Sequence, residues 1–416
     1  MSTALLTDRY ELTMLEAALA SGVAEHRAVF EVFARRLPPG RRFGVVAGQG
    51  RLATLLPAFC FSSADADSVS LQPRTRDWLV DRPLDLTVTG YPEGETYLPA
   101  SPVLTVEGRF GEAVLLETLV LSVLNADSAV ASAAARMVLA AQGRPLIEMG
   151  GRRTQEQAAV SAARAAYVAG FAMTSNLEAG RRHGVPTTGT SAHAFVLAHR
   201  TELEAFRAQV ASLGPGTTLL VDTYDTQQGI RHAVEAAGPG LGGIRLDSGD
   251  PAVEAPRART LLDELGAPAA KIVVTGDLDE HQIAALGPCP VDVLGVGTSV
   301  VTGSGAPTAG FVYKLVAIAR EPGPDAPLVP VAKHSKGKTT IGGRKWATRL
   351  PDGRELLHLT PPGSDDGRAL QQLLPASDGV ERARSTCAAA LAALPVDARE
   401  LTPGSPAGAA TMQEDS

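Results

Sequence analysis

The sequence predicts an α/β fold with a parallel sheet, which forms either a barrel or an open layer. The main observation is a plan shared by four segments, in each of which a short apolar run ends in small, acidic or hydroxyl residues: 217–226, 242–251, 271–280 and 291–300. Stretches that favour helix separate them: 227–237, 252–266 and 279–287. Strands that alternate with helices form βαβ units, and buried parallel strands are near-continuous apolar runs. Ligands bind at the carboxyl ends of such strands, where these polar residues lie.

The remainder of the chain predicts a second, different part. Residues 7–22 fit a helix with Thr7 or Asp8 as its N-cap. Short alternating runs with Pro and Gly follow from about 28 to 110, which is typical of an antiparallel or α+β module. Short strands return after about 320, and residues 402–416 have the composition of a disordered tail.

Composition narrows the classes of function. The chain has 416 residues, 44% hydrophobic and 20% charged, which fits one large and one smaller globular domain. Its 45 acidic and 38 basic residues give a net charge of −7, which argues against nucleic-acid binding or an anionic membrane partner. The three cysteines form no CxxC pair, so a reducing cytoplasm is the simplest compartment. Charged and amide side chains interrupt the apolar stretch at 113–141, which therefore indicates a buried helix and no membrane span.

A glycine-rich segment at the end of the fourth predicted strand indicates a phosphate site. Gly295, Gly297 and Thr298 would offer backbone N–H groups and one hydroxyl at the start of a following helix, where negative charge is favoured. In a barrel, this late position often binds phosphate. An ordinary turn has the same pattern, and the segment alone does not distinguish the two.

Charged side chains at two other strand ends suggest sugar-phosphate chemistry. Arg245 and Asp247 are two residues apart, so in a strand they point to one face. They could neutralise each other as a structural pair, or they could hold a ribosyl diphosphate, the carboxylate binding hydroxyls or a metal. Asp222 has a similar position after the first strand. Mg²⁺ near Asp222, Asp247 and the diphosphate is the metal that these groups suggest, although its ligands are unknown.

Two further motifs have both a structural and a functional interpretation. Arg152 and Arg153 follow an apolar run in a Gly-rich bend, either as a solvated pair or with one side chain turned toward an anion. His193 lies among small neutral residues, where a histidine is commonly a hydrogen-bonded core residue. The alternative is a nucleophile that accepts a phosphoryl group, with Thr190 to orient it or to touch the ligand.

Taken in order, these motifs resemble those of the nicotinate phosphoribosyltransferases. The matching segments are TDRYELTM (7–14), GRRTQ (151–155), GFAMTSN (170–176), GTSAHAFV (189–196), VDTYDT (221–226), GIRLDSGD (243–250), GVGTSVVT (295–302), GFVYKLV (310–316) and a basic segment ending in GGRK (336–345). The resemblance implies an irregular, TIM-like α/β barrel as the catalytic domain over 111–319. It implies an α+β domain over 1–110, completed by about 320–400, and a homodimer with active sites at the interface.

The resemblance also implies a reaction. Nicotinate and 5-phosphoribosyl 1-diphosphate give nicotinate mononucleotide and diphosphate, the first step of NAD salvage from nicotinate. ATP is a co-substrate whose hydrolysis is coupled through a phosphohistidine, and Mg²⁺ is the cofactor. Such an enzyme is classed as an ATP-coupled ligase.

Roles follow for the positions that match the family motifs. His193 matches the phosphorylated histidine, and Asp222 and Asp247 match carboxylates near the ribose, the diphosphate and Mg²⁺. Tyr10 matches an aromatic residue that stacks on the pyridine ring, in the site of the other subunit. The other substrate-binding positions are Arg152, Thr174, Ser175, Thr190, Arg245, Gly276, Gly295, Gly297 and Thr298.

Three positions bear on specificity and coupling. Related nicotinamide-using enzymes have aspartate at the position of Ser175; a carboxylate repels nicotinate, whereas a hydroxyl can donate to it, so the resemblance implies nicotinate. Met149 stands where an aromatic usually stacks on the ring, and Ala194 where serine often follows the histidine.

Two alternatives remain. One is another phosphoribosyltransferase of this fold, such as a quinolinate-using enzyme, which needs a more basic pocket and no ATP-linked histidine. The other is a paralogue that binds a pyridine or phosphoribosyl diphosphate without catalysis.

Overall fold

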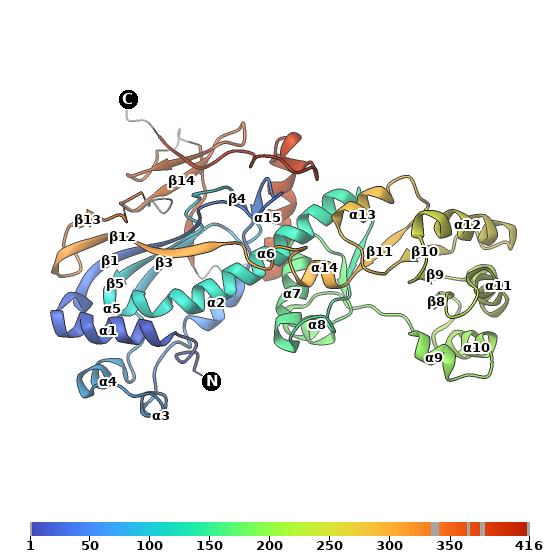
Figure 1. The fold of residues 1–416 in the computed structure, drawn as a ribbon, viewed down its shortest axis with the longest axis horizontal. Helices are drawn as coiled ribbons and strands as arrows, with labels where there is room; N and C mark the ends of the chain where they lie inside the picture. Colours follow the sequence, from blue (N-terminus) through green and yellow to red (C-terminus); the bar gives the residue numbers. More distant parts are fainter. Residues whose placement is uncertain (1, 334–340, 364–366, 375–378, 414–416) are drawn as a thin grey trace. The chain divides into compact units, whose positions relative to one another are not determined.

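The chain forms two compact units, Met1–Ser132 with Ala306–Ser416, and Ala133–Gly305 (Figure 1). The computed structural model describes residues 2–333, 341–363, 367–374 and 379–413. Residues 336–340 of the expected basic segment at 336–345 lie outside these residues.

The first unit is built on a six-stranded antiparallel sheet with the order β13-β12-β1-β5-β3-β17. Strand β1 (His26–Ala34) is central and largely buried, and its Phe30 lies opposite Val106 on one side and Leu315 on the other. Both chain ends therefore contribute to one sheet. The other strands are β3 (Leu86–Gly90), β5 (Leu104–Arg109), β12 (Phe311–Pro322), β13 (Leu328–Pro330) and β17 (Gln372–Leu374).

Helices cover this sheet and set the observed boundary of the unit. Helix α1 (Arg9–Ser21) begins after Asp8 and ends at Gly22 in the left-handed conformation that favours glycine. The first part of helix α6 (Glu117–Ala141) packs in the same apolar core as Leu15 and Phe30. The boundary consequently falls inside α6 and, on the other side, after Gly305, not at 110 and 319 as expected. The other helices are α2 (Gln49–Leu55), α3 (Ser63–Asp67), α4 (Pro73–Leu79), α5 (Phe110–Ala113) and α15 (Gly379–Ala393), with short 3₁₀ turns at Val23–Glu25, Val114–Leu116 and Asp397–Arg399.

A smaller sheet includes residues near the end of the segment expected to be a disordered tail. Strand β18 (Thr411–Met412) pairs in parallel with β15 (Glu355–His358), and Ala410 is buried in the core. The backbone N–H of Gln413 donates to the Leu357 carbonyl over 2.9 Å. These contacts order the segment up to residue 413, whereas 414–416 lie outside the described residues. The remaining strands of this unit are β2 (Gly44–Val45), β4 (Thr96–Tyr97), β14 (Trp346–Arg349) and β16 (Arg368–Ala369).

The run Phe110–Ala141 is long and apolar enough to cross a membrane by length and composition. However, 67% of its most apolar window is buried within the protein. This burial is what a core helix shows, in line with the expectation from the interrupting polar residues.

The second unit contains a six-stranded parallel sheet with the order β7-β6-β11-β10-β9-β8. All four expected strands are present: β8 (Thr218–Leu220), β9 (Gly243–Leu246), β10 (Lys271–Val274) and β11 (Val293–Val296). The sheet continues beyond β11 with β6 (Leu146–Glu148) and β7 (Met173–Thr174). Among the described residues β7 and β8 are its outer strands, so the sheet is a half-barrel and the closed TIM-like barrel is not confirmed.

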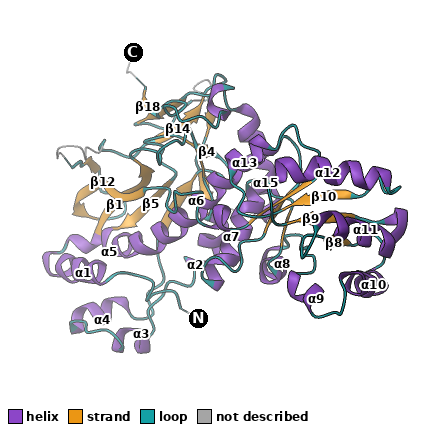
Figure 2. Cartoon of the chain, turned by 45° about the vertical axis from the view of Figure 1, so that its right-hand side comes forward, coloured by secondary structure: helices purple, strands orange, loops and turns teal. Residues whose placement is uncertain are grey.

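Helices follow the strands of this unit, as Figure 2 shows around β8, β9 and β10. Several acidic residues at the strand ends cap them: Asp225 accepts from the N–H of Gln228, Asp250 from that of Ala252 and Asp279 from that of Gln282. The helices are α7 (Glu156–Val168), α8 (Leu177–His183), α9 (His193–Leu197), α10 (Glu202–Leu213), α11 (Thr226–Ala237), α12 (Pro251–Glu264), α13 (Glu280–Ala285) and α14 (Thr298–Val301), with a 3₁₀ turn at Gly238–Gly240.

Candidate active site

Most of the predicted site residues follow the carboxyl ends of the parallel strands. Asp222 follows β8, Arg245 and Asp247 lie at the end of β9, and Gly276 follows β10. Gly295 lies in β11, and Gly297 and Thr298 follow directly. Because the strands are parallel, these ends lie at one edge of the sheet.

His193 and Asp222 form the centre of this edge. The Nε2 atom of His193, the first residue of α9, lies 3.2 Å from Oδ1 of Asp222. The Asp222 side chain is 1% exposed, whereas that of His193 is 40% exposed, so the imidazole is open to a ligand while its partner is not. A carboxylate only accepts hydrogen bonds, so Nε2 carries the proton and the lone pair of a neutral ring remains on Nδ1.

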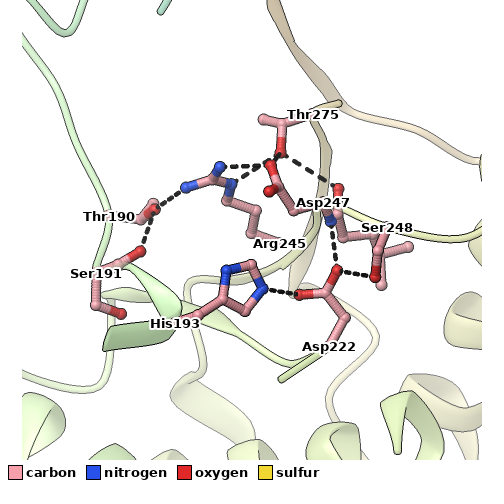
Figure 3. Close-up of polar contacts among 9 residues, drawn as sticks. Thr190, Ser191, His193, Asp222, Arg245, Asp247, Ser248 and Thr275 are labelled. Carbon is pink, nitrogen blue, oxygen red and sulfur yellow. Dashed lines mark hydrogen bonds and ion pairs between the residues drawn. The ribbon is translucent and has the colours of Figure 1, made fainter. Parts of the chain in front are cut away.

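The other oxygen of Asp222 is held just as firmly. Oδ2 accepts from the backbone N–H of Asp247 over 2.8 Å and from the Ser248 hydroxyl over 2.6 Å, as Figure 3 shows. Two donors besides His193 thus orient the carboxylate that in turn orients the imidazole. Sequence reasoning missed Ser248, although a hydroxyl next to Asp247 in a strand-end motif was a usable signal.

Arg245 and Asp247 form the predicted pair, and further contacts extend it. The Nη2 atom of Arg245 lies 2.6 Å from Oδ1 of Asp247, its Nε donates to the Thr275 hydroxyl over 2.9 Å, and its Nη1 donates to the Thr190 hydroxyl over 3.0 Å. Thr275 also donates to Asp247. Burial raises the pKa of Asp247, but the hydrogen bonds of Thr275 and Arg245 and the charge of Arg245 outweigh it, so the pKa lies below the usual value. Thr275, which directly follows the apolar run of β10, was also missed.

Two glycines at this edge of the sheet allow the backbone to lie close to neighbouring residues. Gly276 has φ +104°, and a Cβ on it would lie 2.7 Å from the Asp247 carbonyl oxygen. A Cβ on Gly295 would lie 2.5 Å from Cγ2 of Thr275 and 2.9 Å from Sδ of Met149. Met149 therefore packs directly beside the glycine-rich segment.

The remaining predicted residues of this unit lie at the ends of β6 and β7. Arg152 is exposed in the bend after β6, and Ser175 is exposed after β7. Thr174 is fully buried, and its hydroxyl donates to the buried carboxylate of Glu148, which sequence reasoning did not identify. Since Thr174 has no exposed surface, its hydroxyl contacts protein rather than solvent.

Tyr10 lies in the first unit, on α1, with 44% of its surface exposed. Partial burial and the nearby Glu117 and Glu11 raise the pKa of its phenol, so it stays neutral. Its stacking role in a second subunit stays a prediction.

The residues at the sheet edge suit Mg²⁺ held largely by substrate. Among the described residues, no cluster of three or more His, Cys, Asp or Glu side chains is arranged to hold a metal. Both oxygens of Asp222 are engaged, but Oδ2 of Asp247 has no hydrogen-bond donor in the described chain. Mg²⁺ commonly binds one or two carboxylates together with substrate phosphates and waters, and one free oxygen on an ionised Asp247 fits that mode.

Comparison with known proteins decides the family. The model for the nicotinate phosphoribosyltransferase N-terminal domain matches residues 5–125. The chain is 55% identical to nicotinate phosphoribosyltransferase pncB1 of Mycobacterium tuberculosis, covering 97% of this chain and 94% of that protein. The chain belongs to the nicotinate phosphoribosyltransferase family.

More distant members of the family also match the chain over most of its length. The nicotinate phosphoribosyltransferase of Bacillus subtilis is 37% identical, covering 84% of this chain and 73% of that one. The crystal structure of human nicotinic acid phosphoribosyltransferase superposes with a TM-score of 0.81 at 26% identity, covering 96% of both chains. The mixed α/β fold, with a parallel half-barrel sheet and further sheets, is thus that of the nicotinate phosphoribosyltransferases.

Proposed function

We propose that the protein transfers the phosphoribosyl group of 5-phosphoribosyl 1-diphosphate to nicotinate, giving nicotinate mononucleotide and diphosphate, in pyridine nucleotide biosynthesis. The observation that carries the proposal is the 55% identity, over 97% of the chain, to a protein named for this activity. The residues that hold His193 in place speak against a quinolinate-using enzyme and against an inactive paralogue.

The chemistry of the sheet edge is consistent with this transfer. The ring nitrogen of nicotinate forms a bond to C1′ as the bond from C1′ to the diphosphate oxygen breaks, so positive charge develops on the ribose and negative charge on the leaving group. The carboxylates of Asp222 and Asp247 would stabilise the positive charge on the ribose, and the Arg245 guanidinium would stabilise the negative charge on the diphosphate. The backbone N–H groups around Gly295, Gly297 and Thr298 are candidates for the 5′-phosphate.

ATP coupling through His193 is part of the proposal. The γ-phosphoryl group of ATP would pass to Nδ1 of His193, releasing ADP, and water would later release the phosphate. The hydrogen bond from Nε2 to Asp222 supports this step because it leaves the Nδ1 lone pair free and stabilises the positive charge that the ring gains. Mg²⁺, held by Asp247 and substrate oxygens, would neutralise phosphate charge.

The proposal extends to the choice of substrate and to the assembly of subunits. Ser175 is exposed and uncharged, which favours a carboxylate over a carboxamide. We propose a cytoplasmic homodimer in which the exposed Tyr10 stacks on the pyridine ring in the partner's site.

Diphosphate release by the purified protein tests the function. Phosphoribosyl diphosphate and Mg²⁺ are supplied with nicotinate, nicotinamide or quinolinate, each with and without ATP. We expect release with nicotinate, stimulated by ATP, and loss of the ATP effect in His193→Ala. His199→Ala is a matched control, because His199 follows α9 and its ring contacts Phe195, one turn earlier, rather than the residues at the sheet edge.

The outcomes separate the parts of the proposal. Release with nicotinate but no ATP effect would retain the transferase and remove the phosphohistidine. Release with quinolinate alone would indicate the other phosphoribosyltransferase. Ligand binding without release from any base would indicate an inactive paralogue.

A further inference from the structure

Glu148 is a buried carboxylate at the end of β6 that none of the reactions above uses. Its side chain has no exposed surface, and both of its oxygens accept hydrogen bonds. Oε1 accepts from the backbone N–H of Gly150, and Oε2 accepts from the hydroxyl of Thr174, which lies opposite Glu148 in the parallel pairing of β6 with β7. One side chain therefore joins the segments that follow two neighbouring strands.

Within the described chain no cationic side chain pairs with Glu148, so no opposite charge compensates the burial of this carboxylate. Burial raises the pKa of Glu148, although the hydrogen bonds from Thr174 and Gly150 oppose that shift. A buried acid is costly unless its acceptors are fully used. Leucine or methionine would fill similar space without this cost, so the acceptors themselves are the property that the site needs.

The contacts continue outward from Glu148 on the β7 side. The Thr174 hydroxyl accepts from the backbone N–H of Asn176 over 3.0 Å, and the N–H of Ser175 donates to the Glu148 carbonyl over 2.8 Å. The side chain of Asn176 then caps α8 by accepting from the N–H of Ala179 over 3.0 Å. Ser175 is thus fixed on both sides while its own side chain is exposed.

On the β6 side, the same carboxylate fixes the start of the bend that carries Arg152. The N–H of Met149 donates to the Val296 carbonyl over 2.8 Å, and the N–H of Gly150 donates to Glu148. A Cβ on Gly150 would lie 2.2 Å from Cγ1 of Val301, so the bend also sits tightly against α14. Arg152 and Ser175 are both exposed, and no hydrogen bond engages either side chain in the described residues.

We propose that Glu148 is a positioning residue for recognition of the substrate's acid group. Its two oxygens set the separation between the bend at Gly150–Arg152 and the segment Thr174–Asn176, so that the guanidinium of Arg152 and the hydroxyl of Ser175 meet one carboxylate of a pyridine acid. This inference rests on the proposed function for its substrate. Its structural half, the joining of two segments by one carboxylate, can be tested without turnover.

Glu148→Gln weakens one of the two links. The Gly150 N–H can only donate, so the amide oxygen must face it and the NH₂ group faces Thr174, whose hydroxyl proton then loses its acceptor. We expect the KM for nicotinate to rise about tenfold, while kcat and the KM for phosphoribosyl diphosphate stay within about twofold. Glu148→Leu, which removes both acceptors, should raise the KM for nicotinate by about a hundredfold.

Thr174→Val tests the same link from the other side and does not alter the buried acid. We expect an increase in the KM for nicotinate at least as large as that of Glu148→Gln, because valine also removes the acceptor of the Asn176 N–H. The double variant should show little further increase over Thr174→Val, because both changes break the link between Glu148 and Thr174. The buried carboxylate of Glu202 provides the matched control. It lies on α10, whose Gln209 hydrogen-bonds to β8, the outer strand at the other end of the sheet from β7. Glu202→Gln should leave the KM for nicotinate within about twofold.

Backbone hydrogen exchange gives the readout that is independent of activity. In Glu148→Gln and Thr174→Val we expect faster exchange in peptides spanning Gly150–Arg153 and Thr174–Asn176, and unchanged exchange around α10. If the wild type does not turn over nicotinate, the proposed function fails, and exchange alone decides whether Glu148 joins the segments. The inference is overturned if exchange and the KM for nicotinate match the wild type. It is also overturned if kcat, both KM values and the Tm all worsen together, as a general loss of structure would produce.

Discussion

The substitution Asp222→Asn tests how the buried carboxylate behind His193 works. Its oxygens accept from Nε2 of His193, the N–H of Asp247 and the hydroxyl of Ser248. Asparagine has the same shape but replaces one acceptor by an NH₂ donor. The Asp247 N–H can only donate, so the amide oxygen stays toward Asp247 and Ser248, and the NH₂ group faces His193. Nε2 must then accept, which moves the ring proton to Nδ1 and removes the lone pair there.

The size of the effect follows from this exchange of roles. A hydrogen bond to a charged group contributes about 1.5–3 kcal/mol, which is roughly a 10- to 150-fold effect on an equilibrium or rate. The wrong tautomer adds a further barrier to phosphoryl transfer. We therefore expect phosphorylation of His193 to slow by at least about a hundredfold. Because asparagine is isosteric with aspartate, the Tm should change little.

The assay is the rate of ADP formation together with acid-labile phosphate on the protein. Ser248→Ala is the control, since it removes one of three donors but leaves Oδ1 against His193, and its rate should stay within about tenfold of the wild type. A rate of phosphorylation in Asp222→Asn within about threefold of the wild type would refute the reasoning, because neither the hydrogen bond nor the tautomer would then matter.

Three further predictions concern specificity, packing and pH. Ser175→Asp should lower the preference for nicotinate over nicotinamide, measured as the ratio of kcat/KM values, by about a hundredfold, because like charges repel. Gly295→Ala should destabilise the protein by about 1–3 kcal/mol in urea unfolding, since its Cβ would lie 2.5 Å from Thr275, whereas Gly216→Ala, in open space, should be near neutral. The pKa of Asp247 is lowered by folding, so its stabilising effect is present above its unfolded pKa and is lost as the pH falls through the folded pKa. The difference in unfolding free energy between the wild type and Asp247→Asn should therefore shrink below about pH 4.

Several features of the fold could be predicted because they depend on neighbouring residues. The strands β8 to β11 fall within the four predicted segments, and the helices after β8, β9 and β10 begin where Asp225, Asp250 and Asp279 supply caps. The unit boundaries and the ordered segment near Ala410 could not be predicted. They depend on which apolar faces pack together between segments far apart in the sequence, and local sequence patterns do not predict such packing.

The candidate site was likewise predicted only in part from the sequence. Polar side chains at the ends of parallel strands must lie at one edge of the sheet, so the sequence alone predicted that Asp222, Arg245 and Asp247 lie near each other. It did not predict that Asp247 and Ser248 hold Asp222, or that Thr275 bonds both Arg245 and Asp247.

The sequence by itself determined the family, the strand ends and the residue types that carry the chemistry. Only the tertiary structure decided which atoms meet, and Glu148 is the clearest case. In the sequence it is one acid at the end of an apolar run. Its role follows from β6 lying beside β7, because a buried carboxylate takes the donors that the neighbouring strands bring to it.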